Sequence, residues 1–481
     1  MRKVIISALM GVLLCAVPTT AQEQRAAIEG IVKDSQGAVL PGVTVEARSL
    51  QGAVVSTITE GNGVYRFPAL APGVYAVTAE LAGFQIAKVE SVELTLGTIK
   101  TIGFTLQIAS VTEEVVVTGE APLVDTKQSA RATSLRSDQF ELLPKGRDFS
   151  SLVTQAAGAN NEAKLGGISI DGSSASENRY IVDGVETTDI VQGAVSQGVN
   201  SDFVEEVQIK SSGYTAEYGG ATGGVISVVT KSGSNDLRGM GIFYWSGDKL
   251  EGGRYTNAAE TIAAGGRETL RLSPTNSNVA EYVSYPEDSY NRYEPGFWIG
   301  GPLRKDRAWF WAAYQPRLQD TERTVTFRLD NSTGTFEQKR RVQNVSANQT
   351  AQISDKLRTR AAFNLEYGKV TGLLPALDGS STPVANFGKA TKTPNYTVSG
   401  QADYVANHKM YFGVRAGYSR RNTTDDTVRD GALSWFRTSN VGFAGLDGTV
   451  VPTSLQRVTN FQTDIDNNLS VKDVRTRLNF Q

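Results

Sequence analysis

Residues 205–233 read EEVQIKSSGYTAEYGGATGGVISVVTKSG, and this stretch decides how the rest of the chain is interpreted. Two apolar, β-branched runs, VQI at 207–209 and VISVV at 225–229, flank the loop GGATGG at 219–224. The stretch holds too many glycines for a helix, and its apolar residues alternate too regularly for a linker. It therefore predicts two short strands joined by a glycine-rich loop.

The same glycines would also suit a phosphate-binding loop, because glycine lets the backbone approach an anion closely. Such a loop leads into a helix through Gly-Lys-Ser/Thr. Here a β-branched strand follows the glycines, and Lys231 and Ser232 come only after that strand. The context argues against a nucleotide site.

Several motifs between residues 167 and 233 resemble, in order, the plug domain of TonB-dependent outer-membrane receptors of the Oar-like group. They are GISIDG at 167–172, YIVDGV at 180–185, VEEVQI at 204–209 and the glycine-rich stretch at 219–233. The residues of this plug motif are Asp171, Gly172, Asp183, Gly184, Gly219, Gly220, Gly223 and Gly224.

The resemblance implies a mainly β protein with three folded parts. We expect a signal peptide at 1–21, a β-sandwich at 22–107, a linker at 108–123, a small α+β plug domain at 124–235, and the first strands of a large transmembrane β-barrel at 236–481. The plug loops at 172–178 and 187–200 are polar, and in the family such loops face outward and help to contact the ligand.

Composition excludes several kinds of chemistry. Lys and Arg (48) nearly balance Asp and Glu (50), so the charge does not indicate a nucleic-acid partner. The single cysteine, Cys15, lies in an apolar leader, and the single histidine, His408, lies in a turn-like NHK at 407–409. Metal clusters and Ser-His-Asp catalysis need side chains that the chain mostly lacks. We therefore expect no enzyme, no metal site and no cofactor.

The N-terminus has the three parts of a secretory signal: MRK, an apolar run at 4–17, and PTTAQ at 18–22, with cleavage expected after Ala21. A lipoprotein signal is disfavoured, because Leu14 precedes Cys15 where a small residue is expected. The apolar run is short for a spanning helix, and no later run approaches about twenty apolar residues. The sequence predicts export without a helical anchor.

Residues 27–107 alternate in about seven short runs separated by glycine and proline turns, a pattern typical of a small β-sandwich. The motifs GIVKD at 30–34, GVYRF at 63–67 and PGVY at 72–75 resemble the carboxypeptidase regulatory-like domain. This segment has no histidine and so predicts no peptidase. The fold is shared with carbohydrate-binding modules, so sugar binding by analogy stands beside a spacer or docking role. Tyr65, Phe67 and Tyr75 are interpreted as core residues.

The linker contains EEVVVTGE at 113–120, a short extended segment that resembles the TonB box, the peptide by which the inner-membrane TonB protein grips these receptors. The resemblance implies strand addition, in which backbone groups pair with a sheet edge on the partner. The box residues are Glu114, Val115, Val116, Val117 and Thr118. A last strand of the sandwich is the alternative interpretation.

Residues 137–157 turn helical, with Ser137 and Asp148 as expected caps and Pro144 ending the first turn. Beyond Leu237 the pattern changes again, since all five tryptophans and twelve of the seventeen tyrosines follow it. Alternating segments of about ten residues with aromatic ends predict a transmembrane β-barrel, although a soluble sandwich would alternate too. The long polar stretches at 249–291 and 372–395 are expected outside the cell, and tight turns in the periplasm.

The expected strands after Leu237 number eight to ten, whereas a plugged outer-membrane barrel has about twenty-two. An open wall would leave unpaired backbone in lipid. The family usually ends on an aromatic residue, whereas this chain ends in NFQ at 479–481. We therefore expect an N-terminal fragment of a longer receptor.

The leading functional hypothesis is an outer-membrane receptor that imports a substrate when TonB displaces the plug, with the sandwich and TonB box in the periplasm. Its expected partners are TonB, outer-membrane lipid, and a small-molecule, peptide or glycan substrate. The alternative is an outer-membrane adhesion or surface-organising protein that binds carbohydrate through its N-terminal domain.

Overall fold

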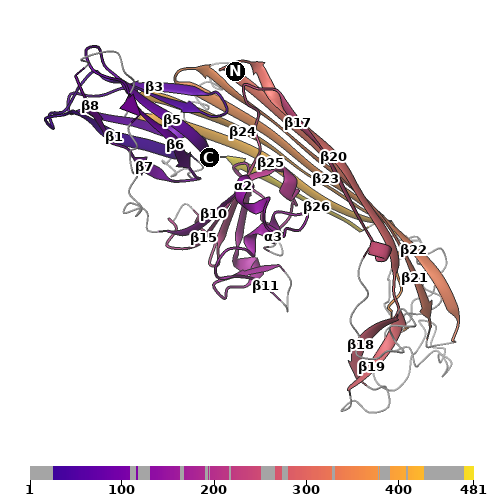
Figure 1. Ribbon diagram of the computed structural model, residues 1–481. Coiled ribbons are helices and arrows are strands. Elements are labelled where there is room, and N and C mark those ends of the chain that lie inside the picture. Colours follow the sequence, from indigo (N-terminus) through magenta and orange to yellow (C-terminus); the bar gives the residue numbers. More distant parts are fainter. Residues whose placement is uncertain are drawn as a thin grey trace, which may run out of the picture.

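The computed structural model describes residues 25–108, 115–116, 130–162, 167–189, 193, 195–215, 218–250, 266–272, 280–327, 331–377, 379, 390–407, 410–426 and 471–480. Along the chain these form a β-sandwich, a small mixed domain and a long antiparallel sheet (Figure 1). The protein is therefore mainly β, as predicted. The signal peptide with Cys15, His408, and the box residues Glu114, Val117 and Thr118 lie outside the described residues.

The sandwich consists of two sheets that share one apolar core. The first contains β4 (Val64–Leu70), β1 (Ala26–Asp34), β7 (Ile99–Thr101) and β8 (Phe104–Leu106). The second contains β3 (Val54–Ile58), β2 (Thr44–Ser49), β5 (Gly73–Glu80), β6 (Ala87–Leu94) and β9 (Val115–Val116). Tyr65, Phe67 and Tyr75 are fully buried in the core, as expected, and so do not form an aromatic platform for a sugar.

The small domain, here called the plug, is built on a five-stranded mixed sheet. Its strand order is β10 (Arg131–Arg136), β15 (Val204–Ser212), β16 (Val225–Thr230), β13 (Arg179–Val182) and β14 (Val185–Glu186). The two strands expected around the glycine loop are β15 and β16, which pair antiparallel with Val207 opposite Val228. The hairpin β11 (Ala159–Asn161) and β12 (Ile168–Ile170) and the short turns η1 (Ala175–Glu177) and η2 (Ser201–Phe203) complete the plug.

Two short helices lie where the sequence pattern turns helical. Helix α2 (Ser137–Phe140) begins one residue earlier than expected, because Arg136 is its cap residue and Gln139 accepts the backbone N–H of Arg136 at 3.1 Å. Helix α3 (Ser150–Val153) begins one residue later than expected, because its N-cap is Phe149 and not Asp148. The Asp148 carboxylate lies just before the cap and accepts the backbone N–H of Ser150 at 2.9 Å.

The long sheet, here called the wall, has eight antiparallel strands among the described residues. They are β17 (Arg238–Gly247), β20 (Ser289–Arg304), β21 (Ala308–Thr326), β22 (Thr333–Ser354), β23 (Leu357–Thr371), β24 (Ala390–Asn407), β25 (Met410–Asp426) and β26 (Val471–Phe480). A separate hairpin, β18 (Gly266–Leu272) and β19 (Ala280–Pro286), follows the short turn η4 (Asp248–Leu250).

The expected strand length of about ten residues is wrong for most of the wall. Strands β21 and β22 contain 19 and 22 residues, and they pair without a break from Ala308 opposite Ala351 to Thr326 opposite Thr333. Threonine hydroxyls contact each other across this pair at 3.0 Å, at Thr324 with Thr335. Polar cross-strand pairs therefore continue the strands beyond the apolar segments that the sequence pattern detects.

The wall has two chemically different faces. Along β20 the exposed residues Tyr293, Phe297 and Ile299 alternate with the buried Glu294 and Gly300. Trp245 of β17 stacks on Tyr293, with 6.2 Å between ring centroids. Such alternation is typical of a sheet that separates a polar interior from lipid.

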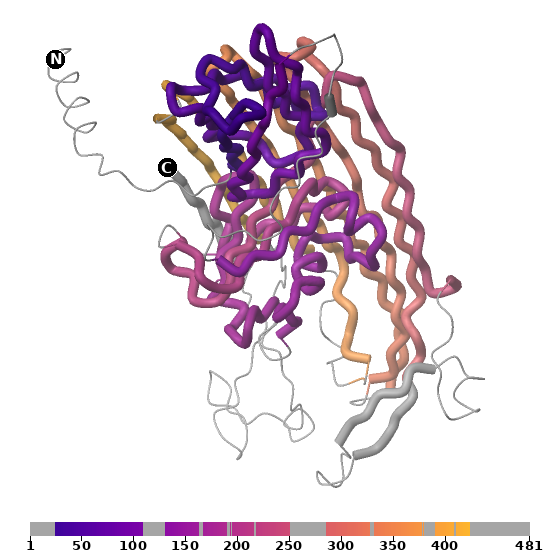
Figure 2. The backbone as a smooth tube through the Cα atoms, turned by 60° about the vertical axis from the view of Figure 1, so that its left-hand side comes forward, coloured from indigo at the N-terminus to yellow at the C-terminus, as the bar shows by residue number. Residues whose placement is uncertain are grey.

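The sandwich and the plug both lie on the concave side of the wall (Figure 2). The sandwich is at the end where tight turns connect the strands, as between Arg304 and Ala308, whereas the β18–β19 hairpin lies at the opposite end (Figure 1). None of the helices in the described ranges has the length and hydropathy needed to cross a membrane.

The glycine loop between β15 and β16 packs tightly against the plug itself. A Cβ atom on Gly224 would lie 2.4 Å from Cδ1 of Ile170, and one on Gly223 would lie 2.4 Å from Oγ of Ser173. Asn178 accepts the backbone N–H of Gly224 at 2.8 Å. These glycines allow close approach of protein groups, which is a packing role.

We expect Gly224→Ala to destabilise the plug by about 1–3 kcal/mol, because the added methyl group overpacks the Ile170 side chain. The matched control is Gly61→Ala, where a Cβ atom would meet nothing within 4 Å. Both variants are titrated with denaturant, and the protease resistance of the plug is measured at each concentration. Equal resistance of the two variants would contradict the packing role.

Candidate functional site

The plug is attached to the wall through a buried polar network around Asp183. Asp183 and Gly184 form the two-residue turn between β13 and β14, with φ of 45° and 84°. Positive φ at both positions is the geometry for which Asp-Gly is preferred in hairpins. The Asp183 carboxylate accepts hydrogen bonds from Nη2 of Arg360 and Nδ2 of Asn364, both at 3.0 Å. It also accepts the backbone N–H of Thr230 at 3.0 Å.

This network joins charged groups that are removed from solvent. The side chain of Asp183 is 1% exposed and that of Arg360 is 13% exposed. A buried ion pair adds little net stability over an apolar pair, but removing one partner leaves an unpaired buried charge, at a cost of about 3–5 kcal/mol. The network therefore fixes the position of the plug on the wall.

Most other contacts between plug and wall are polar as well. Asn200 donates to Gln315 at 2.7 Å, Gln197 donates to the backbone oxygen of Asn364 at 3.1 Å, and Asp189 forms an ion pair with Arg421. Apolar contacts are made by Trp311 and Ala313 of the wall, which belong to the buried apolar cluster of the plug, and by Trp298, which packs against that cluster. The Trp311 ring packs edge-on against Phe203 of the plug at 5.8 Å. An interface of this composition can separate in water at lower cost than an apolar core, because its groups find new partners in the solvent.

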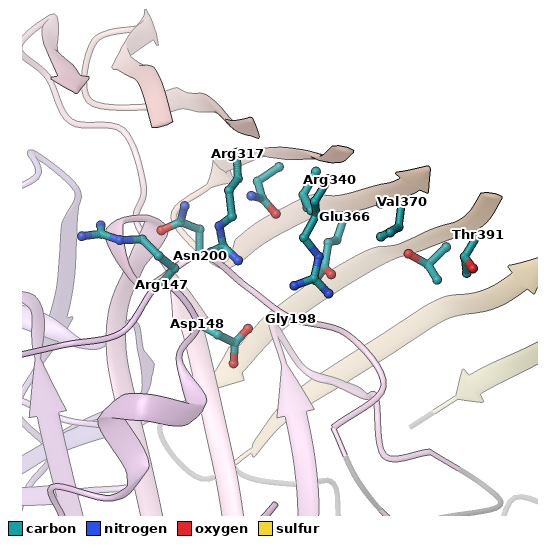
Figure 3. Close-up of a pocket in the computed structure, with 13 residues that line it drawn as sticks. Arg147, Asp148, Gly198, Asn200, Arg317, Arg340, Glu366, Val370 and Thr391 are labelled. Carbon is teal, nitrogen blue, oxygen red and sulfur yellow. The ribbon is translucent and has the colours of Figure 1, made fainter. Parts of the chain in front are cut away.

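A pocket of about 360 Å³ lies between the plug and the wall (Figure 3). Its plug side is formed by the loop at 147–148 and by Gly198 and Asn200. Its wall side includes Arg317, Arg340 and Glu366, from β21, β22 and β23. On β23 the pocket residues Glu366, Gly368 and Val370 follow Arg360 and Asn364. The pocket is therefore farther from the tight-turn end of the wall than the Asp183 network is.

Guanidinium groups dominate the charge of this pocket. Arg147 and Arg317 share Glu294 as a partner, at 3.6 and 3.5 Å, and Arg340 is exposed beside them. The Arg147 guanidinium also lies 3.6 Å from the ring centroid of Tyr244. Burial raises the pKa of Asp148 above its usual value, which favours the uncharged form. The arrangement can hold an anionic group by charge-assisted hydrogen bonds.

The predicted plug-motif residues do not line this pocket. Asp171 and Gly172 form a second turn with positive φ, after β12, where Asp171 is half-exposed and 3.9 Å from Arg131. Gly219 accepts a hydrogen bond from Arg179, and Gly220 has a φ of 89° in the same loop. These residues shape turns and packing, and of the motif it is the Asp183–Gly184 turn that contacts the wall.

Sequence reasoning missed the pocket residues Arg147, Asp148, Arg317, Arg340 and Glu366. Only the predicted ligand loop at 187–200 reaches the pocket, through Gly198 and Asn200. The one available signal was the polar residues, some of them charged, at alternate positions of the wall strands. That signal identifies a pocket only after the strand register is known.

Two residues of the expected TonB box are described. Val115 and Val116 form β9, which pairs in parallel with Ala87 and Lys88 at the edge of the sandwich. The alternative interpretation, a last strand of the sandwich, therefore describes their pairing in this structure. Pairing with TonB stays a prediction.

Comparisons with known proteins agree with both sequence resemblances. Residues 27–107 match the family model described as carboxypeptidase regulatory-like domain. Over 455 residues the chain is 28% identical to the TonB-dependent transporter Oar of Myxococcus xanthus, in a match that covers 87% of this chain and 40% of that protein. The chain thus spans about two-fifths of the length of the curated relative it matches.

Solved structures of lower similarity include a mutant ferric enterobactin receptor from Pseudomonas aeruginosa, at 14% identity and a TM-score of 0.42 over 66% of this chain and 45% of that chain. A siderophore receptor from Acinetobacter baumannii has 16% identity and a TM-score of 0.42 over 73% of this chain and 44% of that chain. The family match at 27–107 and the similarity to a TonB-dependent transporter over 455 residues confirm the resemblances expected from the sequence.

We expect Asp183→Asn to weaken the attachment of the plug to the wall by about 3 kcal/mol, because the substitution removes the buried charged partner of Arg360. Asp171→Asn is a matched control, since Asp171 occupies the same kind of turn but is half-exposed, and its loss should cost less than about 1 kcal/mol. Hydrogen exchange of plug amides measures both effects. Similar exchange rates in the two variants would show that the Asp183 network does not hold the plug.

Proposed function

We propose that the protein is an outer-membrane receptor that binds a polar ligand between plug and wall and admits it when TonB displaces the plug. The observation that carries this proposal is the plug, seated by polar contacts on the concave face of an antiparallel wall, with a charged pocket between the two. The similarity to the Oar transporter supports it.

The path of the chain from the box residues to strand β10 suggests how the plug is displaced. The box residues at 114–118 lead into β10, which is an edge strand of the plug sheet. Strand β10 pairs with β15 from Arg131 opposite Ser212 to Arg136 opposite Glu206. Tension pulling Arg131 away from the sheet loads these backbone hydrogen bonds one after another. An edge strand therefore opens before the central strands do.

The pocket favours a ligand with an anionic group, because Arg317 and Arg340 project from neighbouring strands toward it (Figure 3). Small-molecule, peptide and glycan ligands that carry a carboxylate or phosphate all satisfy this chemistry. Sugar binding by the sandwich has less support, since the aromatic residues Tyr65, Phe67 and Tyr75 are in its core.

Deletion of residues 114–118 should abolish energy-dependent uptake while ligand binding at the cell surface continues, because the partner loses its strand. Uptake of labelled substrate with and without a protonophore measures this effect. Deletion of residues 124–128, between the box and β10 in the chain, is the control of equal length and should leave uptake largely intact. Uptake at the normal rate without 114–118 would point to the adhesion or surface-organising alternative.

Arg317→Ala and Arg340→Ala should each weaken the binding of an anionic ligand by about tenfold or more, since a hydrogen bond to a charged group contributes about 1.5–3 kcal/mol. Labelled citrate is a suitable anionic probe, and labelled maltose a neutral one. Arg341→Ala is the matched control, because Arg341 is adjacent on β22 but pairs with Asp320 at 2.6 Å, away from the pocket. Equal losses in all three variants would exclude a pocket-specific role.

A further inference from the structure

The sandwich contacts the plug and the wall at several places that the proposed receptor function does not explain. The first involves Arg25, near the start of β1. Its side chain is 6% exposed and donates hydrogen bonds to Asp403 and, at 3.4 Å, to Gln401 on β24 of the wall. Asp403 is also 3.8 Å from Arg415. The guanidinium groups of Arg25 and Arg415 thus share one buried carboxylate. The position of the Arg25 side chain on the wall therefore depends on Asp403.

The second contact joins a loop of the sandwich to the plug sheet. The backbone N–H of Leu96 donates to Glu206 at 3.1 Å, and Gln208 donates to the backbone oxygen of Leu96 at 2.6 Å. Leu96, Glu206 and Gln208 are all buried. Both backbone groups of Leu96 are therefore satisfied by side chains of β15, the strand from which β10 has to separate.

The third contact lies at the junction between plug and wall. The backbone N–H of Asn235 donates to the backbone oxygen of Gln51 at 2.9 Å, and Ser232 donates to the Gln51 side chain at 3.1 Å. Asn235 also accepts the indole N–H of Trp309 at 2.8 Å. The turn between β2 and β3 therefore sits on the segment that links plug to wall.

We infer that the sandwich is a latch: it docks on the plug and the wall at these three contacts, holds the plug closed from the tight-turn end of the wall, and must undock before the plug can move. The inference rests on the proposed receptor function for its consequence, but not for the docking itself. Figures 1 and 2 both show the sandwich beside the plug on the concave side of the wall.

The chemistry of the contacts suits a reversible latch. All three consist of hydrogen bonds and one ion pair, which can be exchanged for water at a modest net cost. Strand β9 lies on the edge of the same sandwich, paired with β6. A partner that takes Val115 and Val116 as a strand has to remove them from the sandwich first. Capture of the box and release of the latch are thereby coupled.

Docking can be measured without any ligand. The only cysteine of the chain, Cys15, is in the expected signal peptide, so the pair Gln51→Cys and Ser232→Cys can be joined selectively by a short thiol cross-linker in outer membranes. The pair Thr44→Cys and Ile58→Cys, exposed and opposite each other within the sandwich, serves to normalise the reaction.

In this background Arg25→Glu should lower the normalised cross-linking yield at least threefold, and Arg25→Ala should lower it less. The control Arg48→Glu should have no effect, because Arg48 is exposed and pairs with Glu46 inside the sandwich. Both variants keep Asp403 paired with Arg415, so the wall is expected to fold normally. An unchanged yield in Arg25→Glu would overturn the latch.

The consequence for the plug is tested with a third cysteine, Thr133→Cys on β10, and a maleimide label. In energised cells the label should react faster when the sandwich is free than when it is cross-linked. Equal labelling of free and locked protein would overturn the latch as a control device. No labelling in either state would count against plug displacement itself, and the cross-linking yields would still decide whether the sandwich docks.

A pH dependence provides an independent check. Burial raises the pKa of Glu206 to about 7. The charge of Glu205 also raises this pKa, whereas the hydrogen bond from Leu96 and the charge of Arg136 lower it. Arg136 in turn lies 3.4 Å from Glu93 of the sandwich. When the sandwich is undocked, the pKa of Glu206 should return toward its ordinary value of 4.5. The docked state thus binds the Glu206 proton more tightly than the undocked state does. This stabilises docking at low pH, and the stabilisation is lost as pH rises through about 7.

The normalised yield should therefore be higher at pH 5.5 than at pH 8, and Glu206→Gln should remove the difference. A pH dependence that persists in Glu206→Gln would show that another group controls docking.

Discussion

The structure depends on how a buried charge is accommodated at Asp183. A carboxylate removed from water is tolerated only when donors surround it, and here Arg360, Asn364 and Thr230 supply them. The donors come from both the wall and the plug, so neither part satisfies the carboxylate alone. This requirement sets the position of the plug, and that position creates the pocket next to it. It also leaves an interface rich in polar groups, which water can hydrate when the interface opens, beside the apolar contact around Trp311.

The wall supplies these polar groups because its strands alternate. Inward positions carry Glu294, Arg317 and Glu366, whereas outward positions carry aromatic and aliphatic residues such as Phe297. The same alternation gives the sheet an apolar face on one side and lets its other side contact two folded domains. In the proposed mechanism, tension acts first on the edge strand β10. The sandwich contacts β15, the strand with which β10 pairs. The order of events is therefore set by which strand lies at an edge and which domain covers it.

Much of the architecture could be predicted from local pattern. Strand β3 has the bounds expected from its alternation, and the Asp-Gly pair at 183–184 forms the tight turn that its composition requires. The predictions that failed concern extent. The wall strands are longer than ten residues because Thr-rich segments continue the pairing, and α2 begins at a different cap because Gln139 accepts the N–H of Arg136.

The class of fold, the order of the parts and many of the turns follow from the sequence alone, since they depend on periodicity, glycine and proline within short segments. Only the tertiary structure decided the pocket around Arg317 and Glu366, the partners of Asp183, and the docking of Arg25 on Asp403. Those contacts join residues more than a hundred positions apart or on different strands. They depend on register and domain placement, and a shift of one residue would turn each side chain to the opposite face.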